Sequence, residues 1–529
     1  MRKSFILVVT VLLSVFSLAA QRMSIDNKLR YAGKIVETFY VDPINADSVA
    51  EEAIRAMLKT LDPHSTYSNK EETRELTEPL QGNFSGIGIQ FNMLNDTLYV
   101  IETISGGPSE RVGIVAGDRI ISANDTLISG VKKKNSDIMK ILRGPKGSKV
   151  TVKVKRKGVS ELIDFRITRN DIPIYSVDAS YMAAPGVGYV KISRFAEKTA
   201  KEVRDAVKAL KKQGMKDLII DLEYNGGGYL MAATELSEML LSAGDLVVFT
   251  KGDKSSYQEY RASPKMSLAD GKVVIMVNQY SASASEILSG AVQDNDRGLV
   301  VGRRTFGKGL VQRPFPFPDG SMIRLTVARY YTPSGRCIQK PYSEGDDAYE
   351  NDIENRFNAG ELTNADSVHV NKAERYTTLR NGRTVYGGGG VMPDRFVALD
   401  TTSTSKYSRE ILAKGVYNSF CINYIDEHRK SLKKSYKTED AFINNFVVTE
   451  ELLKQFCDYA EKEGVPFDEK GYEDALPTIK CIIKAIIGRD LFTQSTYYRV
   501  TNEINNVYQE ALRLIQNDQE YNSLLNPSK

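Results

Sequence analysis

The 529-residue chain has few of the side chains that build metal centres and histidine-based triads. It holds three histidines, His64, His369 and His428, which lie in a helical region, a polar insertion and a terminal helical region. No histidine has the context of a strand end, so a His-based triad is not favoured. Paired histidines and Cys-x-x-Cys spacing are also missing, which disfavours a zinc site.

Cysteine and net charge are low as well. The four cysteines, Cys337, Cys421, Cys457 and Cys481, are too few and too far apart for a disulfide scaffold. One bridge among the last three stays open, and buried free thiols are favoured. A net charge of +4 is small for this length and indicates no nucleic-acid partner. The composition, with 41% hydrophobic and 26% charged residues, indicates a globular protein, and the length of 529 residues predicts three or four domains.

Long apolar runs are absent except at the N-terminus. Arg2 and Lys3 precede an apolar stretch from Phe5, and small residues stand near its end at Ala19 and Ala20. This pattern predicts an export signal peptide over residues 1–21. The stretch of about 16 residues is short for a membrane span. The alternative is an uncleaved anchor that keeps the exported protein associated with the membrane.

The first third of the chain changes character at residue 81. Apolar residues at helical spacing predict an N-terminal helical arm over 22–80. Residues 81–169 contain short β-rich runs separated by Gly, Pro and Asn-Asp. One helical pattern, Asn135–Leu142, interrupts these runs. We therefore expect a compact module that consists mostly of strands.

The remainder of the chain predicts an α/β core followed by helices. Over 170–400, apolar strands alternate with amphipathic helices, which indicates βαβ units and a largely parallel sheet. Residues 341–375 are polar and acidic without periodicity, and we interpret them as an insertion loop. Residues 401–529 show helical patterns only and predict a C-terminal helical domain. The fold class is α/β, with several domains.

A serine-rich segment, Asn278–Glu286, lies between the apolar strand Val273–Val277 and a predicted helix. Small residues at such a junction let the chain bend sharply and expose a hydroxyl, and they aim helix N-terminal N–H groups at a developing oxyanion. A nucleophile elbow has this local architecture. A plain N-cap serine cluster is the alternative.

A second segment, Gly302–Gln312, places Lys308 between two glycines. A lysine with a pKa near 10.4 becomes a base at neutral pH only if burial lowers that pKa by roughly three units. A solvated surface charge is the ordinary role of a lysine. Residues Gly302–Lys308 also match the motif of a phosphate-binding loop, but Gly309 stands at the next position, where that loop needs Ser or Thr.

A third segment, Asp221–Gly228, ends a predicted buried strand with three consecutive glycines. Glycines there allow close approach of the backbone to a ligand and can present an N–H as an oxyanion donor. A tight structural turn is the alternative.

Taken together, these segments resemble the carboxyl-terminal processing peptidases, also called tail-specific proteases, which are Ser–Lys serine peptidases with a PDZ domain. The resemblance covers roughly residues 25–400. It implies a crotonase/ClpP-like αβ protease core with an inserted PDZ-like domain. The motifs that carry it are Leu61–Ser65, Asp221–Gly228, Ser281–Glu286, Gln293-Asp294, Thr305–Gly309 with Val311-Gln312, and Gly388–Asp394.

The resemblance implies a role for each matched residue. Ser283 would be the nucleophile, Lys308 the general base and Gln312 the residue that orients it. The oxyanion hole would use the N–H groups of Ala284 and Gly228, with Gly227 as the other candidate. Asp294 would anchor the helix that carries Ser283. The sequence departs from the family pattern Arg-x-Asn-Pro-Gly-Gly, because Glu223 replaces the arginine and Gly226 the proline.

The PDZ resemblance implies a carboxylate-binding loop and a link to the core. The loop would be Gly86, Ile87, Gly88 and Ile89, whose N–H groups would bind a C-terminal carboxylate while the peptide adds as a strand. Residues of the helix Asn135–Leu142 would line its apolar pocket. In some relatives a PDZ arginine reports occupancy to the core, and Arg143 matches its motif. A surface charge at a helix end is the alternative.

These observations predict an exported serine endopeptidase, in a compartment such as the bacterial periplasm, that needs no metal or organic cofactor. Its partners would be proteins with flexible, apolar C-termini, and a homodimer could form through the N-terminal or C-terminal helices. A catalytically silent PDZ adaptor or chaperone is the first alternative. An acyl-CoA enzyme on the same core is the second, and an exported location disfavours it.

Overall fold

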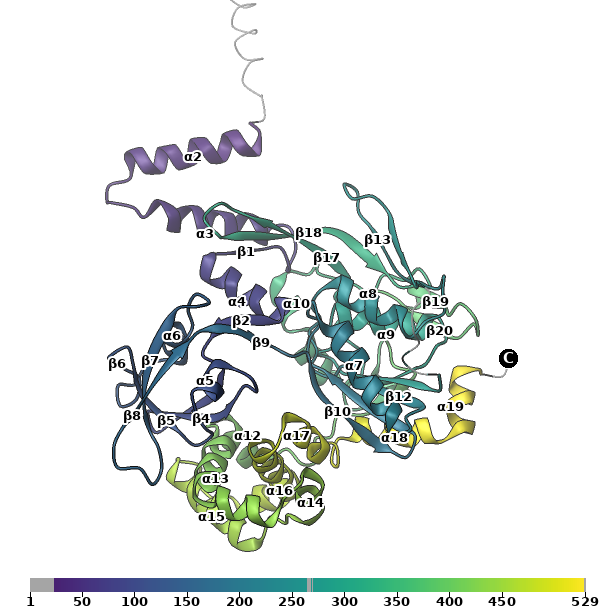
Figure 1. Cartoon of the computed structure of the whole chain (residues 1–529). Coiled ribbons are helices and arrows are strands. Elements are labelled where there is room, and N and C mark those ends of the chain that lie inside the picture. The colour runs from purple at the N-terminus through teal and green to yellow at the C-terminus, as the bar shows by residue number, and fades with distance from the viewer. Residues whose placement is uncertain (1–22, 264–267, 269, 528–529) are drawn as a thin grey trace, which may run out of the picture. The chain divides into compact units, whose positions relative to one another are not determined.

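The computed structural model describes residues 23–263, 268 and 270–527, and the predicted export signal lies outside them. The chain forms two compact units (Figure 1). The first comprises residues up to Glu72 with Pro314–Leu325, and the second comprises Thr73–Arg313 with Thr326–Lys529. No helix within the described ranges combines the length and apolar content needed to cross a membrane.

The first unit is built from two helices and a short strand pair. Helix α2 (Ile25–Phe39) begins after the N-cap Ser24, and α3 (Ala46–Lys59) begins after the N-cap Asn45. Strand β1 (Thr66–Ser68) pairs antiparallel with the beginning of β18 (Met322–Tyr331). The predicted helical arm therefore also contains a strand, which helical periodicity did not indicate. No residue of α2 is buried in the described part of the chain, although the helix is amphipathic.

The β-rich module in the second unit is a sheet with two helices. The strand order is β3-β4-β5-β7-β8, with β6 (Thr126–Leu127) beside β5. Along β7, alternate valines are buried while Lys149 and Lys155 are exposed, so one face of the sheet forms the module's core. The elements are β3 (Ile89–Leu94), β4 (Thr97–Thr103), α5 (Pro108–Arg111), β5 (Arg119–Ala123), α6 (Asn135–Leu142), β7 (Lys149–Lys155) and β8 (Ile163–Thr168).

The α/β core is a six-stranded sheet of order β10-β11-β12-β15-β16-β21. Strands β10 and β11 pair antiparallel, and the other neighbours pair parallel, as the alternation of strands and helices predicted. A separate antiparallel pair, β2 with β9, joins the β-rich module's two ends. The bounds are β2 (Asn83–Gly86), β9 (Asn170–Pro173), β10 (Val177–Ala184), β11 (Val187–Ile192), β12 (Asp217–Asp221), β15 (Val273–Val277), β16 (Leu299–Gly302) and β21 (Arg395–Phe396).

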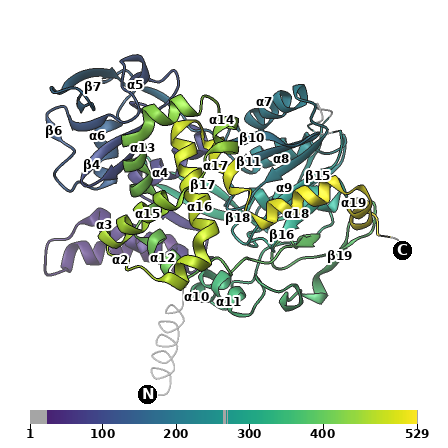
Figure 2. The same ribbon diagram turned by 90° about the horizontal axis from the view of Figure 1, so that it is seen from below.

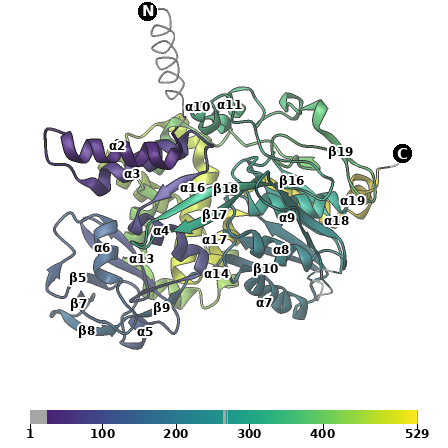
Figure 3. The ribbon, with the colours of Figure 1, turned by 90° about the horizontal axis from the view of Figure 1, so that it is seen from above.

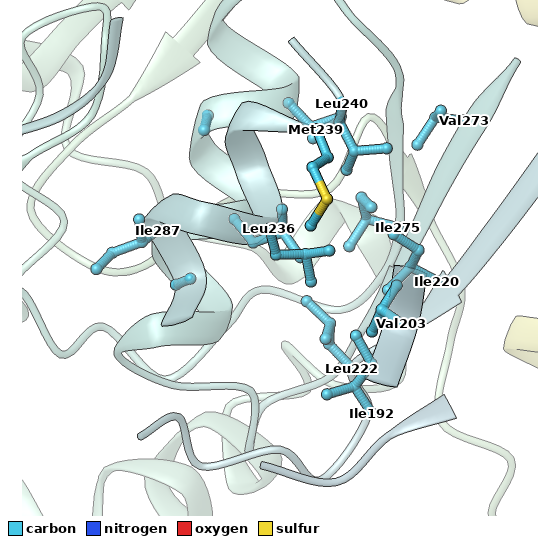
Figure 4. Close-up of a cluster of buried hydrophobic side chains, with 14 of the residues drawn as sticks. Ile192, Val203, Ile220, Leu222, Leu236, Met239, Leu240, Val273, Ile275 and Ile287 are labelled. Carbon is cyan, nitrogen blue, oxygen red and sulfur yellow. The ribbon is translucent and has the colours of Figure 1, made fainter. Parts of the chain in front are cut away.

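Both faces of this sheet are buried, and alternate residues point to opposite faces. Leu218 and Ile220 of β12 join one hydrophobic cluster, while Ile219 joins another. The first cluster contains residues of α7 (Thr199–Lys212), α8 (Leu230–Glu238) and α9 (Ala284–Asp294), and Figure 4 shows Val203, Leu236 and Ile287 among them. Figure 3 shows these three helices as ribbons. Because α9 packs in this cluster, the position of its N-terminus is set by the sheet.

The second face is covered by the last two helices of the chain, α18 (Asn506–Gln516) and α19 (Asp518–Leu525), shown in yellow in Figure 2. Val507, Ala511 and Leu514 pack there against Ile219, Val274 and other strand residues. A parallel sheet needs cover on both faces. Helices α18 and α19 therefore complete the α/β core.

The C-terminal helical region has its own hydrophobic cluster, which includes buried Cys421 and Cys481. All four cysteines are free; Cys421 and Cys481 are buried as predicted, whereas Cys337 and Cys457 are only half-buried. The helices are α12 (Lys406–Ala413), α13 (Val416–Ser435), α14 (Glu439–Asn445), α15 (Glu450–Lys462), α16 (Glu469–Leu491) and α17 (Gln494–Thr501).

Residues 341–375 contain regular structure that their lack of periodicity did not predict. They form α10 (Asp346–Glu350), α11 (Asp352–Asn358) and two turns of 3-10 helix. Arg356 is buried and bonds to Glu361 and to the carbonyl oxygen of Thr305. Polar contacts to the core therefore order this segment. The remaining strands are β13 (Leu246–Lys251), β14 (Gln258–Arg261), β17 (Leu310–Pro316), β18 (Met322–Tyr331), β19 (Arg375–Thr377) and β20 (Thr384–Tyr386).

Candidate active site

Ser283 stands at the sharp turn between β15 and α9, as the sequence predicted for a nucleophile elbow. It is the N-cap of α9 and has φ 55° and ψ −112°. A positive φ is costly for a residue other than glycine, and such backbones gather at functional sites. Ala284 is the first residue of the helix, so its N–H belongs to the helix N-terminus.

The structure distinguishes Ser283 from the two neighbouring serines. Ser281 is buried, and its hydroxyl donates to the carbonyl oxygen of Leu222 at 2.8 Å. Ser285 is also buried, and its hydroxyl donates to the carbonyl oxygen of Asn225 at 2.8 Å. Ser283 is half-buried. The flanking serines therefore hold the backbone, and Ser283 is the one of the three that is not buried.

A buried carboxylate joins the serine turn to the lysine loop. Oε2 of Glu286 accepts the N–H groups of Ser283 and Lys308, both at 2.8 Å. Oε1 accepts the hydroxyl of Thr305 at 2.5 Å and the N–H of Gly307 at 2.7 Å. Burial raises the pKa of this carboxyl, and the hydrogen bonds oppose the rise. Glu286 thus fixes both loops with one side chain.

Tyr330 of β18 makes a second connection between the same two loops. Its hydroxyl lies within hydrogen-bonding distance of the carbonyl oxygens of Ser283 and Lys308. The ring is almost fully buried, and burial raises the pKa of the phenol well above its ordinary value. Lys308 itself is half-buried. The backbones of the predicted nucleophile and the predicted base are therefore held by shared partners.

Sequence reasoning assigned no role to Glu286 or Tyr330. For Glu286 the sequence did contain an indication, because Ser283-x-x-Glu286 has the spacing of a capping box. Tyr330 lies in a separate strand, and no local pattern connects it with the serine turn.

Gln312 lies on β17, four positions after Lys308. Its side-chain nitrogen donates to the carbonyl oxygen of Leu310 at 3.2 Å. This bond stays within the strand, so the orientation of Lys308 by Gln312 remains a prediction.

The glycine turn packs directly against the serine turn. A Cβ on Gly227 would lie 2.8 Å from Cβ of Ser283 and 3.0 Å from the nitrogen of Ala284. The N–H of Gly227 donates to Oδ1 of Asn225 at 2.9 Å, which occupies one of the two candidate oxyanion donors. A Cβ on Gly228 would lie 2.1 Å from the carbonyl oxygen of Phe195, so only glycine fits there.

Asn225 holds the glycine turn from several sides. Its side-chain nitrogen donates to the carbonyl oxygen of Ile192 at 2.9 Å, and its own carbonyl oxygen accepts the N–H of Ala282 at 3.0 Å. Phe195 pairs with Gly228 as an isolated bridge and donates its N–H to the carbonyl oxygen of Gly227. The turn is therefore fixed relative to both β11 and the serine turn.

Asp294 anchors the far end of α9, as the resemblance implied. Its Oδ1 accepts a guanidinium N–H of Arg336 at 2.7 Å, and its Oδ2 accepts the hydroxyl of Ser334 at 2.6 Å. Both side chains of the Arg336–Asp294 pair are 0% exposed. Asp294 therefore acts on the helix that carries Ser283 and lies at its opposite end.

The predicted carboxylate-binding loop joins β2 to β3. The carbonyl oxygen of Ile87 accepts the N–H of Ser109 at 3.0 Å, and Gly88 has φ 75°. Ile138 and Leu142 of α6 are buried in the core of the module. Lining of a peptide groove by α6 therefore stays a prediction.

Arg143 is more engaged than an ordinary surface charge at a helix end. Its guanidinium donates to Oε2 of Glu78 at 2.6 Å and lies 4.5 Å from the ring centroid of Phe84. A Cβ on Gly86 would lie 3.7 Å from Cγ of Arg143. Glu78 belongs to α4 (Lys70–Gln81), so Arg143 connects the predicted carboxylate-binding loop to that helix.

Comparison with known proteins gives family matches over three parts of the chain. The family model of peptidase family S41 matches residues 186–348, and that of the PDZ domain matches residues 85–167. A family of unknown function matches residues 407–493.

The chain is also similar to named proteases. The carboxy-terminal processing protease CtpB of Bacillus subtilis is 35% identical over 327 residues, which are 61% of this chain and 67% of that protein. The carboxy-terminal-processing protease of Bartonella bacilliformis is 35% identical over 310 residues, which are 58% of this chain and 70% of that protein. A solved photosystem II D1 C-terminal processing protease is 30% identical, with 58% of this chain and 83% of that chain covered and a TM-score of 0.33.

The family models and the two bacterial proteases confirm the predicted family and fold class, and they lend nothing to the catalytically silent alternative. The chain belongs to peptidase family S41 and is a serine-type carboxy-terminal processing protease with a PDZ domain.

Proposed function

We propose that Ser283 and Lys308 are the nucleophile and general base of this protease. The observation that carries the proposal is the Glu286 carboxylate, which accepts the backbone N–H groups of both residues. The neutral Lys308 amine takes the hydroxyl proton as Ser283 Oγ attacks the peptide carbonyl carbon. The N–H groups of Ala284 and Gly228 stabilise the oxyanion. Gln312 orients Lys308.

The tetrahedral intermediate collapses by breaking the C–N bond. The leaving amine takes a proton from the Lys308 ammonium, and an acyl ester remains on Ser283. Water then attacks the ester, with Lys308 again as base, and releases the new carboxyl terminus. We expect no metal or organic cofactor in this cycle.

The substrates are proteins with flexible, apolar C-termini, captured by the PDZ domain at Gly86–Ile89. We place the protein in an exported compartment such as a periplasm, on the basis of the signal sequence at residues 1–21. The test is incubation of residues 22–529 with an unfolded protein that has an apolar tail, followed by mass mapping of the fragments. Internal cleavage that depends on the tail supports the proposal. Tail binding without cleavage would instead indicate an adaptor.

We also propose that tail binding completes the catalytic site through Arg143. The support is a short series of contacts from the PDZ domain to the glycine turn. Arg143 pairs with Glu78 of α4, and the carbonyl oxygen of Leu80 in α4 accepts the N–H of Glu197 at 2.9 Å. Glu197 is two residues from Phe195, which pairs with Gly228. Movement at Arg143 can therefore reach the oxyanion donor.

This gate predicts activation in trans. A free peptide with an apolar C-terminus should raise cleavage of a short tail-less substrate, and Arg143→Ala should abolish that increase without weakening peptide binding. A ligand shifts an equilibrium only by its differential affinity for the two states, so binding and rate must both be measured. Lys146→Ala is a control, because Lys146 lies near Arg143 in the chain and pairs with the exposed Asp171 of β9. A rate that stays flat while the peptide binds would show that the PDZ domain is only a tether.

We further propose that α2 pairs with a second copy of the chain. Ile25, Leu29, Ile35, Val36 and Phe39 expose between 37% and 78% of their surface. The last helices already pack on their own sheet, which favours the N-terminal helix as the dimer contact. Leu29→Asp should lower the sedimentation mass of residues 22–529 from dimer to monomer. A dimer that persists in this variant would show that α2 is not the contact, and the C-terminal helices would then be the candidate.

A further inference from the structure

The glycine turn is held at its beginning by a residue of the C-terminal helices. Glu223 is 5% exposed, and Nδ2 of Asn505 donates to its Oε2 at 2.8 Å. Asn505 is the N-cap of α18, and its Oδ1 accepts the N–H groups of Val507 and Tyr508. The Asn505 side chain thus caps the helix with its oxygen and holds Glu223 with its nitrogen.

The backbone of Glu223 is held separately by the sheet. Its N–H donates to Oδ1 of Asp221 at 2.8 Å, and its carbonyl oxygen accepts Nζ of Lys191 at 2.6 Å. Nζ of Lys191 also donates to Oδ1 of Asp221 at 2.9 Å. Arg303 approaches the Glu223 carboxylate only to 3.7 Å. Among these contacts, the bond from Asn505 is the one that fixes the carboxylate at normal hydrogen-bond length.

The backbone that follows Glu223 needs such support. Tyr224 has φ 60°, and Gly227 and Gly228 have φ 101° and 147°. Residues in sparsely populated backbone regions persist only where their surroundings over-determine them. A displacement of about 1 Å at a catalytic group can cost on the order of 100-fold in rate. The turn, strained at Tyr224, ends at Gly228, the proposed oxyanion donor.

We propose that Asn505 is a positioning residue of the protease: through Glu223 it holds the glycine turn that presents Gly228 to the oxyanion. The inference rests on the proposed function and extends it to helix α18, which lies beyond the residues matched by the peptidase family model. The C-terminal helices then contribute to catalysis as well as to the core. Glu223 stands where the family pattern has an arginine, and its carboxylate is the group that accepts the bond from Asn505.

The charged and titratable groups around Glu223 define a pH-dependent test. They are Asp221, Lys191, Arg303 and Tyr224. Burial, together with the negative charge of Asp221, raises the pKa of Glu223 to about 7. Asn505→Asp keeps a good N-cap but places a second carboxyl against Glu223. The two carboxyls can share a hydrogen bond while one of them is protonated, and they repel each other when both are ionised.

Asn505→Asp should therefore retain most activity at pH 6 and lose on the order of 100-fold in kcat at pH 8.5 relative to wild type. KM should change little, because an oxyanion donor acts mainly in the transition state. Adding Glu223→Gln reverses the polarity of the bond, since the new amide can donate to the new carboxylate. The double variant should recover alkaline activity to within about threefold.

Asn517→Asp is the matched control. Asn517 caps α19 through Oδ1, and its nitrogen donates to Oε2 of Glu520 at 3.3 Å. This substitution also places a carboxyl beside a glutamate, here at the N-cap of α19 and away from the glycine turn. Its pH profile should follow that of the wild type.

The measurements are kcat and KM for a tail-less peptide, the labelling rate of Ser283 by a fluorophosphonate, and the thermal midpoint, at pH 6 and pH 8.5. Loss of labelling and kcat at pH 8.5 in a folded Asn505→Asp protein, with recovery in the double variant, supports the proposal. Loss that only tracks unfolding, loss shared by Asn517→Asp, or no recovery would overturn it. Wild-type protein that is neither labelled nor active would overturn the proposed function, and this inference with it.

Discussion

Replacing Ser283 with alanine should remove proteolysis and leave the fold intact. The hydroxyl supplies the attacking oxygen, so the rate should fall by at least about a thousand-fold. Alanine keeps the backbone N–H that donates to Glu286. Lys308→Arg should be equally inactive, because a guanidinium cannot give up its proton at working pH. The measurements are peptide cleavage, labelling by a serine-reactive probe and thermal unfolding.

The neighbouring serines provide controls in the same turn. Ser281→Ala and Ser285→Ala each remove a buried hydrogen bond to a backbone carbonyl oxygen. Each should lower the free energy of unfolding by about 1 to 3 kcal/mol and leave most of the activity. An inactive, folded Ser285→Ala protein beside an active Ser283→Ala protein would show that the nucleophile is misassigned. Activity in Lys308→Arg would exclude the lysine-base mechanism.

The order of the main elements could be predicted because each strand, helix and turn has a local pattern of apolar and small residues. The buried strand Val273–Val277 and the small residues after it predicted the turn at Ser283, and the structure has both. The strand and helix alternation predicted a largely parallel sheet, which is confirmed. Such patterns repeat within a few residues and need no knowledge of distant contacts.

The partners of these elements could not be predicted in the same way. The period of α18 shows that one of its faces is apolar, but not that this face covers β12 and β15. Residues 341–375 are ordered by buried polar contacts such as Arg356 with Glu361, which leave no periodic trace. The same holds for Tyr330 and Asn505, whose roles depend on residues far away in sequence.

Replacing Glu286 with glutamine should disable the protease by separating the two catalytic loops. The carboxylate accepts four hydrogen bonds, from Ser283, Lys308, Gly307 and Thr305. An amide has one acceptor oxygen, and its NH2 group would face two of these donors. Either the pair of Ser283 and Lys308 or the pair of Gly307 and Thr305 must then move. We expect kcat to fall on the order of 100- to 1,000-fold, about 3 to 4 kcal/mol, as for loss of one oxyanion donor.

Glu202 in α7 provides a control that distinguishes a loss of catalysis from a loss of stability, because its carboxylate also accepts several hydrogen bonds. Oε2 of Glu202 in α7 accepts the N–H groups of Ser176 and Val177 and the hydroxyl of Ser176. Glu202→Gln should lower the thermal midpoint and leave kcat of the folded fraction unchanged. Glu286→Gln should lower both, and it should slow labelling of Ser283 in protein that is still folded. If the activity of Glu286→Gln fell only with the folded fraction, Glu286 would be a helix cap, and the alignment of Ser283 with Lys308 would have to come from Tyr330.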